Sequence, residues 1–218
     1  SGIPRGVGSD HHESHYSVVV LVSLRYDEAA IVSRLSDLDR SAKTAFAASC
    51  AQRLLPLFER FARSVGTPEL APRLRVIVDA AWDVASGAGA DVAARQAEAE
   101  GMVPTDEDDW TLETGYAQNA AAAAAYAIRT WLTDDPQEAA WAARQVYELA
   151  DYAVLQGRPA LDLNAPESEA QVLESETVQN ALIALDHALV VVESAPSTWQ
   201  ELREDAIADS EAWAGTLP

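Results

Sequence analysis

A run of six consecutive alanines at residues 120–125 restricts the fold of this chain more than any other feature. It lies within the segment YAQNAAAAAAYAIRTWL, residues 116–132. Alanine is the strongest helix former, and a helix with small side chains on nearly every side lets its neighbours approach closely. We therefore expect residues 116–132 to form a central helix.

Composition extends this expectation to the whole chain. Alanine supplies 43 of the 218 residues, glycine and proline supply ten each, and runs of alternating β-branched residues are nearly absent. Apolar residues recur at the three- and four-residue spacing of amphipathic helices, which predicts seven or eight of them. Their expected ranges are about 27–38, 41–65, 68–85, 92–100, 116–132, 135–156, 178–192 and 197–215.

The chain shows no internal repeat and no change of composition that would divide it. We expect an all-α fold, a single compact globular bundle that occupies residues 17–218. Residues 1–16, which include His11, His12 and His15, have the character of a tag, a processing remnant or a disordered tail.

Pro56 lies inside the second expected helix, in the segment RLLPLFERF, residues 53–61. A proline in a helix interior removes a backbone hydrogen bond and costs about 3 kcal/mol. At about 100° per residue, Pro56 and Gln52 fall on or near the face opposite Leu54 and Leu57. We expect a kink with Pro56 on the solvent side, so that the apolar face curves around the core.

The charge of the chain is strongly acidic and unevenly distributed. The formal net charge is −20, to which residues 1–75 contribute +2 and residues 76–218 contribute −22. Binding to nucleic acid depends on Lys and Arg that neutralise phosphates, so this balance argues against nucleic acid and against an anionic membrane surface as partners. The simplest interpretation is that the acidic charge keeps the protein soluble. The more specific interpretation is that it attracts a basic protein partner.

Cysteine content and hydropathy indicate a cytoplasmic protein. Cys50 is the only cysteine, so no intrachain disulfide can form, which fits a reducing compartment. Because Phe46, Leu54 and Phe61 surround it at helical spacing, we expect Cys50 to be a small buried hydrophobe and not a nucleophile. The apolar segment 17–24 is far shorter than the ~20 residues that span a bilayer.

Arg53 is the first candidate binding residue. It flanks the apolar face of its helix, where an arginine usually needs a carboxylate partner. We expect a structural ion pair with Asp79, Asp83 or Asp151, and a ligand-binding arginine is the alternative.

The second candidate is the segment PTDEDDW, residues 104–110, in which Trp110 follows Asp106, Glu107, Asp108 and Asp109. A calcium loop would need a glycine at its turn, and this segment has none, so no metal site is expected. One interpretation is a solvated helix entry, with an aspartate near the positive end of the next helix. The other is recognition of a basic partner, with Trp110 as an aromatic anchor beside steering charge.

Three segments carry a resemblance to a known family: AFAASCAQRLLPLFERF at 45–61, LRVIVDAAWDV at 74–84 and NAAAAAAYAIRTWL at 119–132. They resemble the bacterial family typified by the YjaG protein, which is catalogued as a domain of unknown function. The resemblance covers roughly residues 26–195, and Gln52 stands where that family is expected to have Glu. It implies an all-helical, cytoplasmic bacterial protein and brings no established chemistry.

A catalytic interpretation finds little support. The chain has no glycine-rich phosphate loop, paired-cysteine motif, metalloprotease helix or nucleophile elbow. His187 falls opposite the apolar stripe of its helix and should be exposed. The acid pairs at 135–138 and 148–151 imitate those that hold magnesium in helical nucleotide pyrophosphatases, but they spread around one helix. We expect no catalytic residue, metal or cofactor.

The favoured function is a non-catalytic, acidic protein-interaction module, such as an inhibitor or an immunity-type protein of a basic protein partner. The alternative is a metal-dependent, all-helical enzyme that acts on a small phosphorylated molecule. A second alternative is a self-associating structural protein, because Ile183, Val190 and Val191 lie off the main apolar stripe of their helix.

Overall fold

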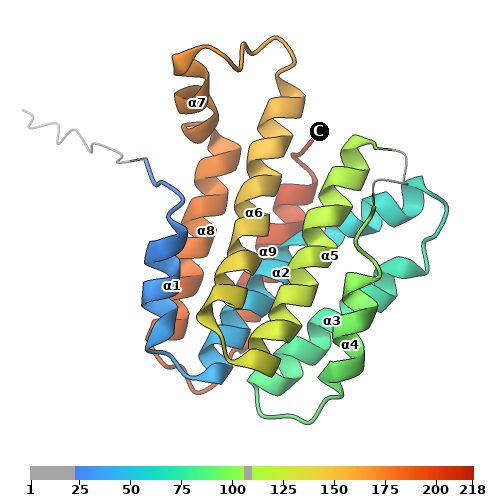
Figure 1. Cartoon of the computed structure of the whole chain (residues 1–218), viewed down its shortest axis with the longest axis vertical. Coiled ribbons are helices and arrows are strands. Elements are labelled where there is room, and N and C mark those ends of the chain that lie inside the picture. Colours follow the sequence, from blue (N-terminus) through green and yellow to red (C-terminus); the bar gives the residue numbers. More distant parts are fainter. Residues whose placement is uncertain (1–22, 106–109) are drawn as a thin grey trace, which may run out of the picture.

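The computed structural model describes residues 23–105 and 110–218, and this part of the chain is all-α, as expected (Figure 1). The proposed tail at residues 1–16 lies outside the described residues. The described residues form nine helices, where seven or eight were expected for the chain: α1 (Glu28–Ser36), α2 (Arg40–Ser64), α3 (Leu70–Ala85), α4 (Val92–Glu100), α5 (Leu112–Thr133), α6 (Pro136–Gly157), α7 (Pro166–Leu173), α8 (Glu176–Glu193) and α9 (Gln200–Ala214).

The core forms around α2, which packs against α3, α5, α6, α8 and α9. All of its residues from Ala42 to Leu55 are buried, so this helix is covered on every side along that stretch. Its most extensive contact is with the alanine-rich α5. Buried alanines on both helices allow their backbones to approach closely. The expected position of the alanine-rich helix at the centre is confirmed.

The face of α2 near Pro56 differs from the expectation. The helix continues through Pro56, which is half-buried, but Gln52 is buried instead of facing solvent. The Gln52 side chain accepts a hydrogen bond from Trp82 Nε1 at 3.3 Å. The expectation for Gln52 was wrong because α3 covers this face, and the periodicity of one helix does not show that a neighbour covers its second side.

Several helices begin where the local sequence supplies a cap. The side chains of Asp27 and Asp39 accept hydrogen bonds from backbone N–H groups in the first turns of α1 and α2. Asp135 does the same for α6, with Pro136 in the first helical position, where its missing N–H is not needed.

The additional helix, α7, lies between the helices expected at residues 135–156 and 178–192, where no helix was expected. Pro166 starts it, and Val172 is its buried apolar residue, resting on the ends of α6 and α8. Figure 1 shows that α7 stands at one end of the bundle, beyond the level of most other helices. One buried apolar side chain in a helix of eight residues is too weak a periodic signal to predict it.

None of the helices in the described part of the chain is both long enough and apolar enough to cross a bilayer.

Candidate functional site

A cavity of about 370 Å³ opens between α8 and α9, and we name it the Arg53 cavity. Arg53 of α2 and Val146 of α6 are buried at its floor, while exposed side chains of α8 and α9 form its rim. Its lining residues are Arg53, Val146, Asn180, Ala181, Ile183, Ala184, His187, Asp209, Ala212, Trp213 and Thr216. Ala181, Ala184 and Ala212 line the cavity with small side chains, and larger side chains at these positions would occupy part of its volume.

The Arg53 side chain is only 2 % exposed, yet its hydrogen bonds are few and long. Nε and Nη2 both donate to a single oxygen, Asp209 Oδ2, at 3.3 Å, and Nη1 donates to the Ser49 carbonyl oxygen at 3.2 Å. Charge-assisted N–H···O bonds are usually about 2.7–2.9 Å long. A guanidinium has five N–H donors, so two of those on Arg53 have no acceptor among the described residues.

Asp209 neutralises Arg53 incompletely. Its side chain is 50 % exposed, so water competes for the carboxylate and weakens the ion pair. A second donor near the cavity is also unused: the buried indole N–H of Trp213 has no hydrogen-bond partner in the described part of the chain. Two N–H groups of Arg53 and the indole N–H of Trp213 therefore lack acceptors among the described residues beside this cavity.

Cys50 lies one turn before Arg53 on α2 and is fully buried. Burial raises the pKa of its thiol to about 12, although the nearby Arg53 charge acts in the opposite direction. The thiol therefore stays protonated and unreactive, and the expected buried position of Cys50 is confirmed.

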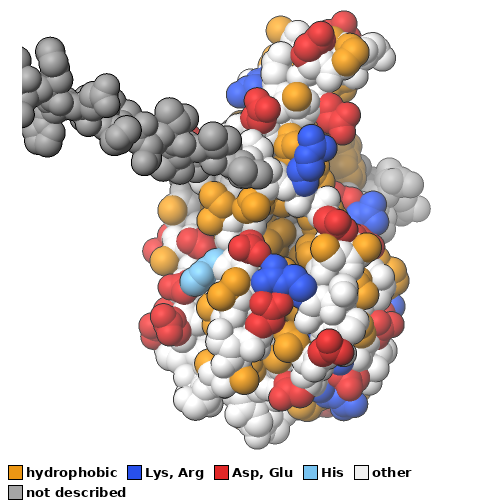
Figure 2. Space-filling view, turned by 90° about the vertical axis from the view of Figure 1, so that its left-hand side faces the viewer, with side chains coloured by type: hydrophobic (Ala, Val, Ile, Leu, Met, Phe, Trp, Pro, Cys, Tyr) orange, Lys and Arg blue, Asp and Glu red, His pale blue; other side chains and the backbone are white. Residues whose placement is uncertain are grey.

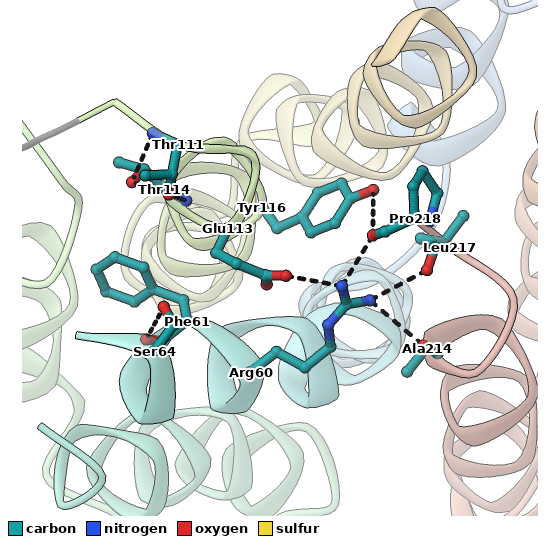
Figure 3. Close-up of polar contacts among 10 residues, drawn as sticks. All are labelled: Arg60, Phe61, Ser64, Thr111, Glu113, Thr114, Tyr116, Ala214, Leu217 and Pro218. Atoms are coloured by element: carbon teal, nitrogen blue, oxygen red, sulfur yellow. Dashed lines mark hydrogen bonds and ion pairs between the residues drawn. The ribbon is translucent and has the colours of Figure 1, made fainter. Parts of the chain in front are cut away.

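Arg60 lies on α2 about two turns after Arg53, and its surroundings differ from those of Arg53 (Figure 3). Its Nη2 donates to Glu113 Oε1 at 2.7 Å and to the Pro218 carbonyl oxygen at 2.8 Å. Its Nη1 reaches the carbonyl oxygens of Ala214 and Leu217 at 3.4 and 3.3 Å. The guanidinium carbon also lies 5.6 Å from the centre of the Tyr116 ring. Arg60 thus ties α2 to α5 and to the segment after α9, and this arrangement is structural.

A second concave site lies beneath α7, and we name it the acidic cleft. It has a volume of about 420 Å³ and is lined by Arg25, Tyr26, Tyr147, Asp151, Leu155, Leu163, Ser168, Glu169, Val172 and Leu173. The rings of Tyr26 and Tyr147 stack with centres 4.7 Å apart and an angle of 6° between their planes. Burial is the main reason that the pKa values of both phenols are raised, so both stay neutral.

Asp151 is the half-buried carboxylate of the acidic cleft. It makes no hydrogen bond or ion pair with another described residue, and burial raises its pKa, with a further contribution from the charge of Glu148. Glu169, at the rim, is exposed and also has no cationic partner among the described residues. The cleft thus combines an aromatic and aliphatic wall with two acids that form no ion pair with a described residue, and Arg25 is the one basic residue in its described lining.

Figure 2 views the molecule from the side of α1 and α8 and shows the wider charge pattern. Red acidic side chains are spread over the face and over the end that includes α7, while blue basic side chains are few. Hydrophobic side chains are exposed between them. Two of the exposed hydrophobic residues on α8 are Ile183, at 54 %, and Val190, at 49 %.

The structure does not bring together the candidate binding residues that were proposed from the sequence. Arg53 pairs with Asp209, so the expected partners Asp79, Asp83 and Asp151 were wrong; Asp79 instead pairs with Arg203 at 2.7 Å. Trp110 is 54 % exposed. Asp106, Glu107, Asp108 and Asp109 lie outside the described residues, so their proposed role stays a prediction.

The acids of the alternative magnesium site point to separate partners. Glu138 pairs with Arg129 at 2.6 Å, and Glu148 pairs with Arg144 at 2.7 Å. In residues 23–105 and 110–218, no three His, Cys, Asp or Glu side chains come together in a way that could hold a metal ion. His187 is exposed, as expected, and its Nε2 lies 3.2 Å from Asp205 Oδ2 at the edge of the Arg53 cavity.

Sequence reasoning missed Asp209, Tyr26 and Tyr147 as site residues. Asp209 is one of many acids on an exposed helix face, and no local pattern distinguishes it from its neighbours. The two tyrosines come from distant segments, and the one available signal was an aromatic residue directly before the cap of α1.

Comparison with known proteins decides the family. Residues 30–210 match the family described as "Protein of unknown function (DUF416)". The chain belongs to this family. A crystal structure of a DUF416 family protein from Shewanella baltica OS155 has a similar fold, with a TM-score of 0.69 and 16% sequence identity, over 81% of this chain and 93% of that one. No curated protein matches this chain.

Proposed function

We propose that this DUF416 chain is a non-catalytic protein-interaction module that holds a basic segment of a protein partner in the acidic cleft. An inhibitor or an immunity-type protein would use such a surface. The observation that carries the proposal is the pairing of Asp151 and Glu169 with the Tyr26–Tyr147 stack in one cleft.

The chemistry of the cleft suits a lysine or arginine side chain of the partner. The aliphatic stem would lie along Leu155 and Val172, while the charge would approach the two carboxylates. Tyrosine faces attract cations with about 0.5–1 kcal/mol at exposed sites and more where water is excluded. The surplus of acids across the molecule would speed encounter with a basic partner at low salt.

A labelled peptide of alternating lysine and leucine, followed by fluorescence anisotropy, tests this proposal. We expect saturable binding that weakens about tenfold or more when the salt rises from about 0.05 to 0.5 M, because ionic screening shortens the reach of exposed charges. The same peptide with every lysine acetylated should not bind. The double variant Asp151→Asn with Glu169→Gln should weaken binding about tenfold.

The matched control is Glu204→Gln with Glu211→Gln, which makes the same change in net charge on α9, away from the cleft. It should change the affinity by less than about twofold, since only the long-range field is altered. Equal losses in the two double variants would show that the peptide senses net charge alone and would refute the cleft as the site.

Self-association is a second proposal, supported by two exposed apolar residues of α8: Ile183, at the rim of the Arg53 cavity, and Val190. Sedimentation should then show a mass that rises with concentration, and Ile183→Lys should abolish the rise. The enzyme alternative receives no such support, because Glu138 and Glu148 are held in separate ion pairs.

Two narrower inferences accompany the main proposal. We infer that the chain is of the YjaG type within its family, from the segment at residues 46–61. We also propose a cytoplasmic location, which the single buried cysteine supports.

A further inference from the structure

We propose that the Arg53 cavity is a binding site for a small organic carboxylate with an apolar body. The proposal is independent of the acidic cleft, because the two sites share no lining residue. It starts from an imbalance: a guanidinium that is 98 % buried has two N–H groups without acceptors in the described part of the chain.

A buried charge is costly unless a partner neutralises it and fills its hydrogen bonds. Asp209 offers a single oxygen at 3.3 Å from Nε and Nη2 and is itself half exposed. A carboxylate that enters the cavity would bring two oxygens with the spacing of the guanidinium fork, which forms short paired bonds. Arg53 is also the one Arg or Lys among the described residues that line this cavity, so it selects where an anion would bind.

The walls specify the rest of the ligand. Val146, Ala181, Ala184 and Ala212 contribute apolar surface, and the Trp213 side chain adds an aromatic face. A volume of about 370 Å³ lies at the lower end of the range for small-molecule sites. The apolar part of the lining favours an aliphatic or aromatic body, and Asn180, His187 and Thr216 add polar side chains at its edge.

The charge balance favours a monoanion over a phosphate dianion. Asp209 already offsets part of the Arg53 charge, and the whole protein carries a net charge of −20. A dianion would face a larger repulsion from this field with the same single guanidinium to oppose it. We therefore name the ligand class as monocarboxylates of about six to nine non-hydrogen atoms, with an expected Kd of about 0.1–1 mM.

Titration of the ¹⁵N-labelled protein with hexanoate, followed by NMR, tests the site. We expect saturable shifts for Trp213 and for backbone amides of α8 and α9 next to the cavity. Hexanamide, which has the same shape without the charge, should bind at least tenfold more weakly. Inorganic phosphate should also bind at least tenfold more weakly.

Two variants assign the binding to the cavity. Ala184→Phe places a ring in the cavity without changing Arg53, and it should abolish binding of hexanoate. Ala208→Phe adds the same ring to an exposed position of α9 that does not line the cavity, and it should leave the Kd within about twofold. Arg53→Lys keeps the charge but loses the fork, and it should weaken binding about tenfold.

Ala184→Phe keeps the test decisive even if Arg53→Lys does not fold. The absence of saturable binding of hexanoate to the wild-type protein would overturn the proposal. So would an unchanged Kd in Ala184→Phe, or equal affinity for hexanoate and hexanamide. Tighter binding of phosphate than of hexanoate would overturn the assigned ligand class.

Discussion

Arg53 and Arg60 lie seven residues apart on one face of α2, almost two turns, yet they have opposite surroundings. Arg60 is the less buried of the two, and four oxygens of α5 and of the segment from Ala214 to Pro218 receive its hydrogen bonds. Arg53 is almost completely buried, and its one carboxylate partner among the described residues, Asp209, is half exposed and accepts only long hydrogen bonds of 3.3 Å. Burial alone therefore does not identify a structural arginine. The number and length of its hydrogen bonds do.

Removal of Arg60 gives the largest effect that we expect from this comparison. Arg60→Met leaves Glu113 and three carbonyl oxygens without their donor, which should cost about 3 kcal/mol. For a chain of this size, that corresponds to a fall in Tm of about 6–12 °C. Differential scanning calorimetry measures it. A fall below about 3 °C would mean that Arg60 does not hold the two segments together.

Removal of Arg53 should cost less, although Arg53 is more deeply buried. In Arg53→Met the new side chain fits among apolar walls, and the exposed Asp209 regains water, so the cost should not exceed about 1.5 kcal/mol. Urea unfolding of both methionine variants compares them directly. If Arg53→Met is the more destabilised of the two, the distinction between these arginines is wrong.

Neutralisation of Asp209, the ion-pair partner of Arg53, tests the same comparison of Arg53 with Arg60. Asp209→Asn keeps an acceptor oxygen but leaves Arg53 without its counter-charge, so stability should fall by about 1 kcal/mol. The same change removes a competitor for the guanidinium and should raise the affinity for hexanoate about threefold to tenfold. Titration calorimetry gives the affinity, and an unchanged or weaker Kd would contradict this role of Asp209.

Substitution of Asp151 should give the smallest change in stability. Asp151 is an acid that, like Arg53, is partly or wholly buried without a full set of partners among the described residues. Burial raises its pKa, so the folded protein holds this proton more tightly than the unfolded chain. Its ionisation therefore lowers stability as the pH rises from the ordinary Asp value through the raised one. Asp151→Asn removes this penalty and should raise the Tm slightly at neutral pH.

The pH dependence distinguishes this explanation from others. The difference in Tm between Asp151→Asn and the wild type should disappear below the ordinary Asp pKa of about 3.9, where both states are protonated. Thermal melts over a series of pH values measure this difference. A variant that is less stable than the wild type at neutral pH would show that the carboxylate makes a stabilising contact.

Much of the fold follows from local sequence, and the exceptions share one cause. The helix starts next to Asp27 and Asp135, the buried Cys50 and the exposed His187 all agree with the expectation from the local sequence. Gln52 does not, because α3 covers its face. The short α7 was missed, because its contacts with α6 and α8 hold it in place and its own periodicity is weak.

The candidate sites were less accessible to sequence reasoning than the fold. Arg53 could be selected because an arginine beside an apolar face needs a partner. Its partner, Asp209, is 156 positions away, and the other candidate acids offered equal chemistry. The acidic cleft needed Tyr26 and Tyr147 to meet across helices, which no spacing rule predicts.

The sequence by itself determined that this protein is helical, acidic and built on closely packed alanine-rich helices. These properties depend on backbone propensity and on contacts three or four residues apart, which the chain carries locally. Only the tertiary structure decided that Arg60 has hydrogen-bond acceptors around its guanidinium while Arg53 lines a cavity with some of its N–H groups unpaired in the described part of the chain. That outcome depends on how α8 and α9 pack against α2, so it arises from the register between helices and from no segment alone.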